Sequence, residues 1–126
     1  MKHSSLEKGF TLIELLITLA VAAILTAIAI PAYNGYITTA RMTEAHNNLA
    51  ALRLAQEEYF LENNNYFDGA NATDIATNSG NLWAVTKGSD GYNFDYVVTL
   101  SSGWTATATG KAGTKVAGET VKVEKE

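Results

Sequence analysis

Residues 8–30 read KGFTLIELLITLAVAAILTAIAI, and this stretch decides the architecture of the chain. No charged residue falls between Leu15 and Ile30, and the only charge back to Phe10 is that of Glu14. A helix of about 20 apolar residues crosses the hydrocarbon core of a bilayer. The stretch therefore predicts a helix that can span a membrane.

The segment ahead of this run, residues 1–9, indicates which way the helix crosses. It carries Lys2 and Lys8 against a single acidic residue, Glu7. Basic residues that flank a membrane helix favour the cytoplasmic side. We therefore expect the rest of the chain to face outward.

Three fates of the apolar run are compatible with its composition. An ordinary signal peptidase could cut after Ala27-Ile28-Ala29 and release a periplasmic binding domain. The run could instead be a permanent anchor, or a short leader could be removed ahead of it while the helix is retained. The first two fates leave Glu14 unexplained, because a carboxylate in a membrane span costs up to about 3 kcal/mol at the bilayer centre and usually has a partner.

The stretch Lys8-Gly9-Phe10-Thr11-Leu12-Ile13-Glu14 resembles the class III signal of type IV prepilins and pseudopilins, and Pro31 and Tyr33 also match that family. The resemblance implies cleavage between Gly9 and Phe10 by a prepilin peptidase, which also N-methylates Phe10. It implies storage in the bacterial inner membrane and polymerisation there by an assembly machinery, with copies of itself or with other pilins. Glu14 would pair with the N-terminal amine of a neighbouring subunit. The family is not enzymatic, and the resemblance implies no cofactor.

Two residues within the helical region predict a departure from a straight helix. Pro31 lacks a backbone N–H and clashes with the preceding turn, and Gly35 adds backbone freedom four residues later. We expect a kink at Pro31 and Gly35, although Pro31 could also end the membrane helix. By the resemblance, residues 22–30 could lose helical structure inside a filament.

Apolar side chains recur at helical spacing after this point. Offsets of three and four residues join Met42, Ala45, Leu49, Leu52 and Tyr59, with Gln56 as the odd member. Charged residues occupy the opposite face. The pattern predicts an apolar membrane or filament-core helix over 10–36 and an amphipathic continuation over 37–62 that packs on a globular domain.

The remainder predicts a small sheet. Asn63-Asn64-Asn65 stops the helix, residues 63–91 form an αβ-loop with a short helical turn at 70–76, and residues 92–126 alternate as an antiparallel meander of three to four strands. We expect an α+β, pilin-like fold with one sheet face on the amphipathic helix. Four aromatic residues should pin the loop to the helix, in a pattern that resembles minor pilins: Tyr59, Phe60, Tyr66 and Phe67.

Composition excludes several classes of site. The 126 residues carry a net charge of −4 and no cysteine, so no disulfide or thiolate metal site can form. Asp90 and Asp95 bracket Gly91 but do not make a full calcium ligand set, and we predict no metal. Glutamates interleave with Lys111, Lys115, Lys122 and Lys125, which argues against a basic nucleic-acid stripe. Phe10, Tyr33 and Tyr36 are predicted to pack helices in the filament core.

The sequence thus favours a structural subunit of a type IV pilus, major or minor, that serves adhesion, motility or uptake in an extracellular filament. The nearest alternative is a pseudopilin of a type II secretion system, which would remain periplasmic. A periplasmic binding domain released by signal peptidase is the third interpretation. The sequence alone does not separate a major from a minor pilin.

Overall fold

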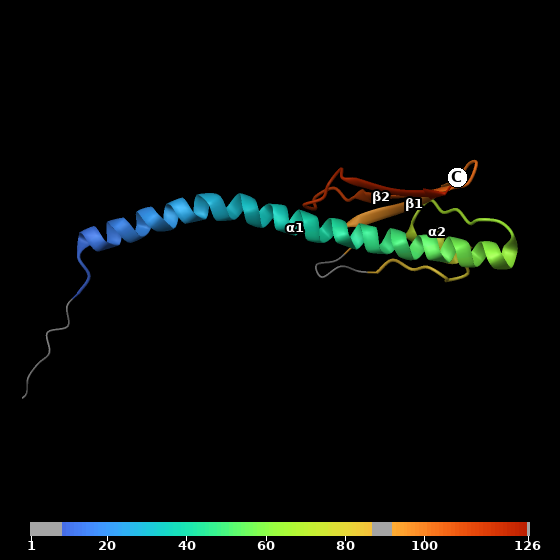
Figure 1. Ribbon diagram of the computed structural model, residues 1–126, viewed down its shortest axis with the longest axis horizontal. Helices are drawn as coiled ribbons and strands as arrows, with labels where there is room; N and C mark the ends of the chain where they lie inside the picture. Colours follow the sequence, from blue (N-terminus) through green and yellow to red (C-terminus); the bar gives the residue numbers. More distant parts are fainter. Residues whose placement is uncertain (1–8, 87–91, 126) are drawn as a thin grey trace, which may run out of the picture. The chain divides into compact units, whose positions relative to one another are not determined.

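The computed structural model describes residues 9–86 and 92–125 of the chain. The elements are α1 (Leu12–Asn63), α2 (Ala72–Asn78), β1 (Phe94–Leu100), β2 (Trp104–Gly110) and β3 (Thr120–Lys125) (Figure 1). The chain divides into two compact units, Met1–Tyr36 and Ile37–Glu126. Helix α1 contributes its first half to one unit and its second half to the other.

The first unit is built on the apolar half of α1. This helix contains a window with a mean hydropathy of 2.6, long and apolar enough to cross a membrane, and none of the window is buried inside the chain. The helix continues through Pro31, so the alternative in which Pro31 ends it is wrong. The kink at Pro31 and Gly35 stays a prediction, as does the opening of residues 22–30.

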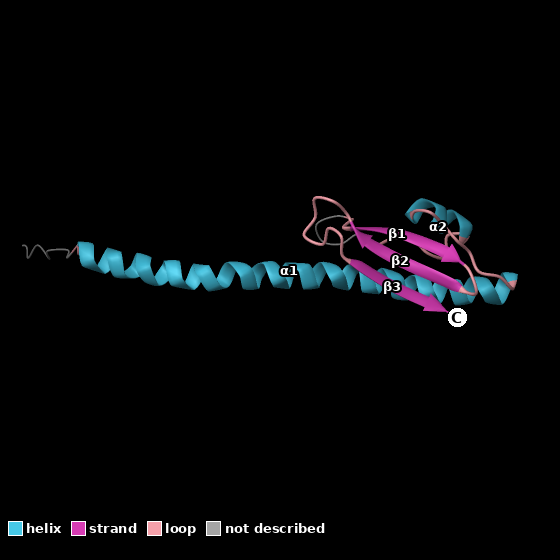
Figure 2. Ribbon diagram, turned by 90° about the horizontal axis from the view of Figure 1, so that it is seen from above, coloured by secondary structure: helices cyan, strands magenta, loops and turns pink. Residues whose placement is uncertain are grey.

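The second unit contains an antiparallel sheet of order β1-β2-β3, with Tyr96 opposite Ala108 and Ala108 opposite Val121. Figure 2 shows the three strands side by side over the second half of α1, with α2 next to β1. The predicted α+β fold is confirmed. The fourth strand that the sequence allowed is not formed within residues 92–125, where Val116 lies in the turns between β2 and β3 and is fully buried.

The core lies between the inner face of the sheet and one face of α1. Alternation along the strands buries Phe94, Tyr96 and Val98 on β1 and Trp104, Ala106 and Ala108 on β2. The helix supplies Ala45, Leu49, Leu52 and Ala55 to the same cluster. Small alanines on β2 next to large side chains on β1 and α1 let the two layers interdigitate.

The αβ-loop is pinned to the end of α1 by the predicted aromatic residues. Tyr59 and Phe67 meet edge to face with ring centroids 5.4 Å apart, and Phe60 stacks on Tyr66 at 4.7 Å. Gln56, the odd member of the apolar stripe, is fully buried. Its Nε2 donates to the Phe67 carbonyl at 2.7 Å and its Oε1 accepts from the Phe67 N–H at 3.2 Å. One side chain therefore satisfies both backbone groups of a buried loop residue.

We expect Gln56→Met to lower the free energy of unfolding by about 2–4 kcal/mol, because it leaves two buried backbone groups of Phe67 without partners. The urea midpoint, followed by the near-ultraviolet signal of Trp83 and Trp104, measures the effect. Glu58→Met, on the exposed face of the same helix, is the control and should stay within about 0.5 kcal/mol. Equal midpoints for the two variants would contradict the pairing role of Gln56.

A second buried amide, Asn48, holds residues 83–86 against α1. Its Nδ2 donates to the Thr86 carbonyl at 3.1 Å and to the Tyr96 hydroxyl at 2.9 Å, and its Oδ1 accepts from the Thr86 N–H at 2.9 Å. The Asn48 carbonyl accepts from the Trp83 indole at 2.9 Å. Burial raises the pKa of the Tyr96 hydroxyl to about 12, while the hydrogen bond from Asn48 acts in the opposite direction.

The raised pKa of Tyr96 predicts a loss of stability at alkaline pH. In the unfolded chain this hydroxyl ionises near pH 10, whereas in the folded chain it stays neutral to about pH 12. The unfolded state therefore binds fewer protons over this window, and the free energy of unfolding should fall by about 2 kcal/mol between pH 10 and 12. Tyr96→Phe should flatten this part of the urea-midpoint profile; an unchanged slope would exclude Tyr96 as its source.

The last strand is held to α1 by a charge contact. The Lys125 Nζ donates to both carboxylate oxygens of Glu57 at 2.7 and 2.8 Å and lies 5.7 Å from the centroid of the Tyr66 ring. Hydrogen bonding to Glu57 raises the pKa of Lys125. Strand β3 extends as far as Lys125. The contact joins strand, helix and loop in a chain that has no disulfide.

Candidate functional site

The predicted cleavage site precedes the first helical residue. Gly9 and Phe10 lie outside regular secondary structure, and α1 begins at Leu12. A Cβ added to Gly9 would meet nothing within 4 Å, and the Phe10 side chain is 87% exposed. A protease binds its substrate in extended form, so a non-helical segment at Gly9–Phe10 suits the assigned cut. Residues 1–8 of the leader lie outside the described part of the chain.

Glu14 has a local partner that the sequence analysis missed. The Glu14 Oε2 accepts hydrogen bonds from the Thr11 N–H at 2.8 Å and from the Thr11 hydroxyl at 2.9 Å. The Thr11 hydroxyl in turn accepts from the Glu14 N–H at 3.2 Å. This reciprocal arrangement is a capping box, whose T-x-x-E signature is visible in the sequence. Glu14 therefore starts the helix, in addition to any role between subunits.

The capping box does not use the whole carboxylate. Both hydrogen bonds from Thr11 go to Oε2, and within residues 9–86 and 92–125 no partner is found for Oε1. One oxygen can thus hold the helix start while the other meets a cation. Pairing of Glu14 with the amine of a neighbouring Phe10 stays a prediction, and its test must separate capping from charge.

The apolar half of α1 is exposed on every side. Eleven large apolar side chains between Leu12 and Ile30 are at least half exposed. Complete burial of one such side chain stabilises by about 1.5–3 kcal/mol. Transfer of all eleven side chains from water into a bilayer or a bundle of copies therefore stabilises by at most about 15–30 kcal/mol.

The second half of α1 also has a face that the sheet does not cover. Leu54 and Leu61, seven residues apart, are 72% and 85% exposed, while Leu49 and Leu52 are buried against the sheet. Two turns separate Leu54 from Leu61, so they share one face of the helix. These two exposed leucines are a second candidate for contact with other subunits.

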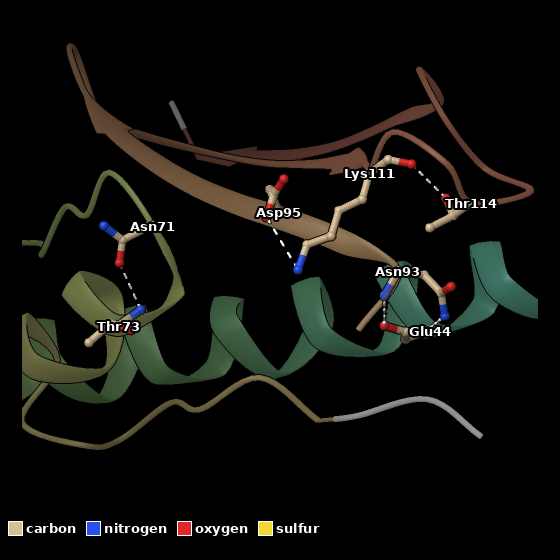
Figure 3. A network of polar contacts seen from close by, with 7 residues as sticks. All are labelled: Glu44, Asn71, Thr73, Asn93, Asp95, Lys111 and Thr114. Atoms are coloured by element: carbon tan, nitrogen blue, oxygen red, sulfur yellow. Dashed lines mark hydrogen bonds and ion pairs between the residues drawn. The ribbon is translucent and has the colours of Figure 1, made fainter. Parts of the chain in front are cut away.

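Polar contacts join the start of β1 to α1 and to the turn after β2 (Figure 3). Glu44 accepts from the Asn93 side-chain amide at 2.8 Å, and the Lys111 N–H donates to the Asn93 carbonyl at 2.9 Å. The Lys111 ammonium lies 3.5 Å from an Asp95 oxygen and points toward it in Figure 3. Asp95, weighed as a calcium ligand, is thus occupied by a cation of its own chain.

The other two members of that weak calcium pattern, Asp90 and Gly91, lie outside the described residues. Over the described ranges, 9–86 and 92–125, no group of three or more acidic, histidine or cysteine side chains could hold a metal ion.

Comparison with known proteins gives two family matches. Residues 31–119 match the family described as "Type IV minor pilin ComP, DNA uptake sequence receptor", and residues 4–30 match the "Prokaryotic N-terminal methylation motif". Among curated relatives, the type IV major pilin protein PilA of Myxococcus xanthus is 45% identical over 61% of this chain and 35% of its own length. The type IV major fimbrial protein FimA of Dichelobacter nodosus is 35% identical over 75% of this chain and 65% of its own length.

The chain thus spans from about a third to just under two thirds of the length of these relatives. No solved structure matches it. The two family matches together run from residue 4 to residue 119 and cover the helix, the loop and most of the sheet. The chain belongs to the type IV pilins, a family of structural, non-enzymatic proteins, and within it to the minor-pilin family matched by residues 31–119.

Proposed function

We propose that this chain is a subunit of an extracellular type IV pilus, cut between Gly9 and Phe10, N-methylated at Phe10 and held in the inner membrane before assembly. The observation that carries the proposal is the apolar half of α1, directly after the leader in the sequence, none of which is buried inside the chain. A soluble monomer would leave this surface in water, whereas a bilayer first and neighbouring copies later remove it from water. The match of residues 4–30 to the methylation motif supports the same processing.

Assembly would use two surfaces. The apolar half of α1 forms the filament core, where Glu14 meets the Phe10 amine of a neighbour. Leu54 and Leu61 on the second half offer a further apolar contact. We assign the chain to a minor rather than a major pilin because the match over 31–119 is to a minor-pilin family.

Isolation of sheared surface fibres tests this function. We expect the chain in the sheared fraction, together with a more abundant pilin. Its confinement to the periplasm, next to a type II secretion system, would contradict the proposal and favour the pseudopilin alternative. Its presence as the main subunit would contradict only the minor rank.

DNA uptake is a second candidate function, favoured by the description of the family matched by residues 31–119. Lys111, Lys115, Lys122 and Lys125 are the cations that would meet phosphate. Lys111 is paired with Asp95 and Lys125 with Glu57. Lys122 projects from the exposed face of β3.

Fluorescence anisotropy with labelled duplex DNA at several salt concentrations tests this candidate. Lys122→Glu should weaken binding and reduce its salt dependence, because fewer counterions are released. Thr120→Ser, on the same strand face, is the control. Binding that is absent at low salt, or equal for the two variants, would argue against a role for this face.

A further inference from the structure

Two tyrosines close the apolar half of α1 and share one helix face. On this face, Ala29 is followed by Ala32, Tyr33 and Tyr36, at offsets of three, four and seven residues. The two rings are 67% and 76% exposed. Together with Ile30 and the two alanines they line a hollow of about 420 Å³ that presents apolar side chains and ring surfaces.

The position of these tyrosines matches the thickness of a bilayer. From Leu12, the first residue of α1, to Tyr33 the helix rises about 32 Å at 1.5 Å per residue. The hydrocarbon core of a bilayer is about 30 Å thick. Charge alone does not set this boundary, because the first charged residue after Glu14 is Arg41, which would allow a span of about 40 Å.

Tyrosine suits such a boundary for a chemical reason. Its ring packs among acyl chains while its hydroxyl stays hydrated, and tyrosines are enriched where a membrane helix leaves the hydrocarbon. Helical side chains also lean toward the N-terminus. Here that direction brings both rings back over the alanines, on the side of the apolar run.

We propose that Tyr33 and Tyr36 form an interfacial anchor that fixes the outer boundary of the membrane-spanning helix, with lipid acyl chains filling the hollow beside the rings. Lipid is favoured over a second copy of the chain because the hollow is continuous with the membrane-spanning surface, and because its first tyrosine, Tyr33, lies one bilayer thickness after Leu12. The anchor places Pro31 inside the outer leaflet and Thr39 in water. The inference rests on the proposed function, in which the membrane holds the subunit before assembly. It adds the depth at which the helix lies in that membrane.

Depth measurement in vesicles tests the anchor. The chain has no cysteine, so single nitroxide labels can be placed at Ala29→Cys, Ala32→Cys and Ala40→Cys in the full chain. In vesicles of phosphatidylethanolamine and phosphatidylglycerol, collisions with oxygen should dominate at residues 29 and 32, and collisions with a water-soluble nickel chelate should dominate at residue 40. The boundary then lies between residues 32 and 40.

Substitution asks whether the tyrosines set this boundary. In the labelled chains, Tyr33→Ala combined with Tyr36→Ala should move the boundary by about one helical turn, roughly 5 Å. Tyr33→Trp with Tyr36→Trp should leave it in place, as should the control pair Ile17→Ala with Ile24→Ala, which removes apolar volume from the middle of the span.

A boundary that the double alanine variant does not move would overturn the anchor. Spin–spin broadening at residue 32, with both collision reagents excluded, would also overturn it and assign the tyrosines to a contact between copies. Filament recovery is read separately. A tyrosine-dependent boundary in a chain that never enters filaments would support the anchor and contradict only the proposed function.

Discussion

Cells that produce the Glu14→Gln variant should process and store the subunit normally but incorporate it into sheared filaments at less than about a tenth of the wild-type amount. Glutamine can keep the capping box, because its side-chain oxygen accepts from Thr11 as the carboxylate does. It removes the negative charge that would meet the Phe10 amine of a neighbour. If the lost charge pairing is worth about 1.4 kcal/mol per contact, the equilibrium constant for adding a subunit to the filament falls tenfold. Immunoblots of sheared and membrane fractions measure the ratio.

The matched control is Thr11→Val, which removes both hydroxyl contacts of the capping box and keeps the charge of Glu14. Loss of an N-terminal cap costs about 1 kcal/mol of helix stability, which a bilayer or filament can absorb. We expect filament incorporation close to wild type for this variant, after N-terminal processing has been verified. The reverse order, with Glu14→Gln assembling and Thr11→Val failing, would mean that Glu14 acts as a cap and not as a charge partner.

The Gly110→Ala variant should lose about 3 kcal/mol of its free energy of unfolding, the largest stability effect that we predict for a single methyl group. A Cβ at Gly110 would lie 1.7 Å from the Val116 carbonyl oxygen and 2.6 Å from its carbon, both backbone atoms. The turn after β2 cannot move away easily, because Gly110 donates to Glu119 at 2.8 Å and accepts from Gly118 at 3.2 Å. Overpacking of a well-packed site typically costs about 1–3 kcal/mol, and we expect the upper end here because the clashing atoms belong to the backbone.

Gly113→Ala, in the same turn, separates this clash from a general effect of removing glycine. A Cβ at Gly113 meets nothing within 4 Å, although its φ of +82° disfavours other residues. We therefore expect a cost of only about 1 kcal/mol. The urea midpoint of the near-ultraviolet signal compares the two variants. A Gly110→Ala chain as stable as Gly113→Ala would show that the 111–119 turn can relax.

Periodicity predicted most of the fold. Spacing at three and four residues placed Ala45, Leu49 and Leu52 on one face of a helix, and the structure confirms this set. Alternation predicted an antiparallel meander within 92–126, and the structure has three antiparallel strands there. The short helical turn expected at 70–76 is α2, Ala72–Asn78, displaced by two residues. Its start is fixed by Asn71, whose Oδ1 accepts from the Thr73 and Asp74 N–H groups.

Contacts between distant segments could not be predicted in the same way. In the sequence Asn48 is one polar residue on a predicted helix. Only the tertiary fold brings its side chain to Thr86 and Tyr96. Val116 is a β-branched residue of the kind enriched in strands. It lies instead in the turn that packs against Gly110, where it is buried outside the sheet. In both cases the partner is fixed by tertiary packing, on which local spacing carries no information.

The candidate site was predicted from its motif rather than from periodicity. Gly9, Phe10 and Glu14 stand at fixed offsets from the apolar run, and the family matches place the chain among the type IV pilins. The capping role of Glu14 could have been predicted as well, because Thr11 stands three residues before it. A charge in an apolar run also calls for a partner outside the chain, so the sequence alone does not separate the capping role of Glu14 from a charge-pairing role.

The most direct test of the proposed function is the mass of the N-terminal peptide of the mature subunit, recovered from sheared filaments. We predict a chain that begins at Phe10 with one methyl group on its amine and retains the helix that starts at Leu12. A chain that begins near Pro31 would contradict this account, because the segment proposed to hold the subunit in the membrane and then in the filament would have been removed.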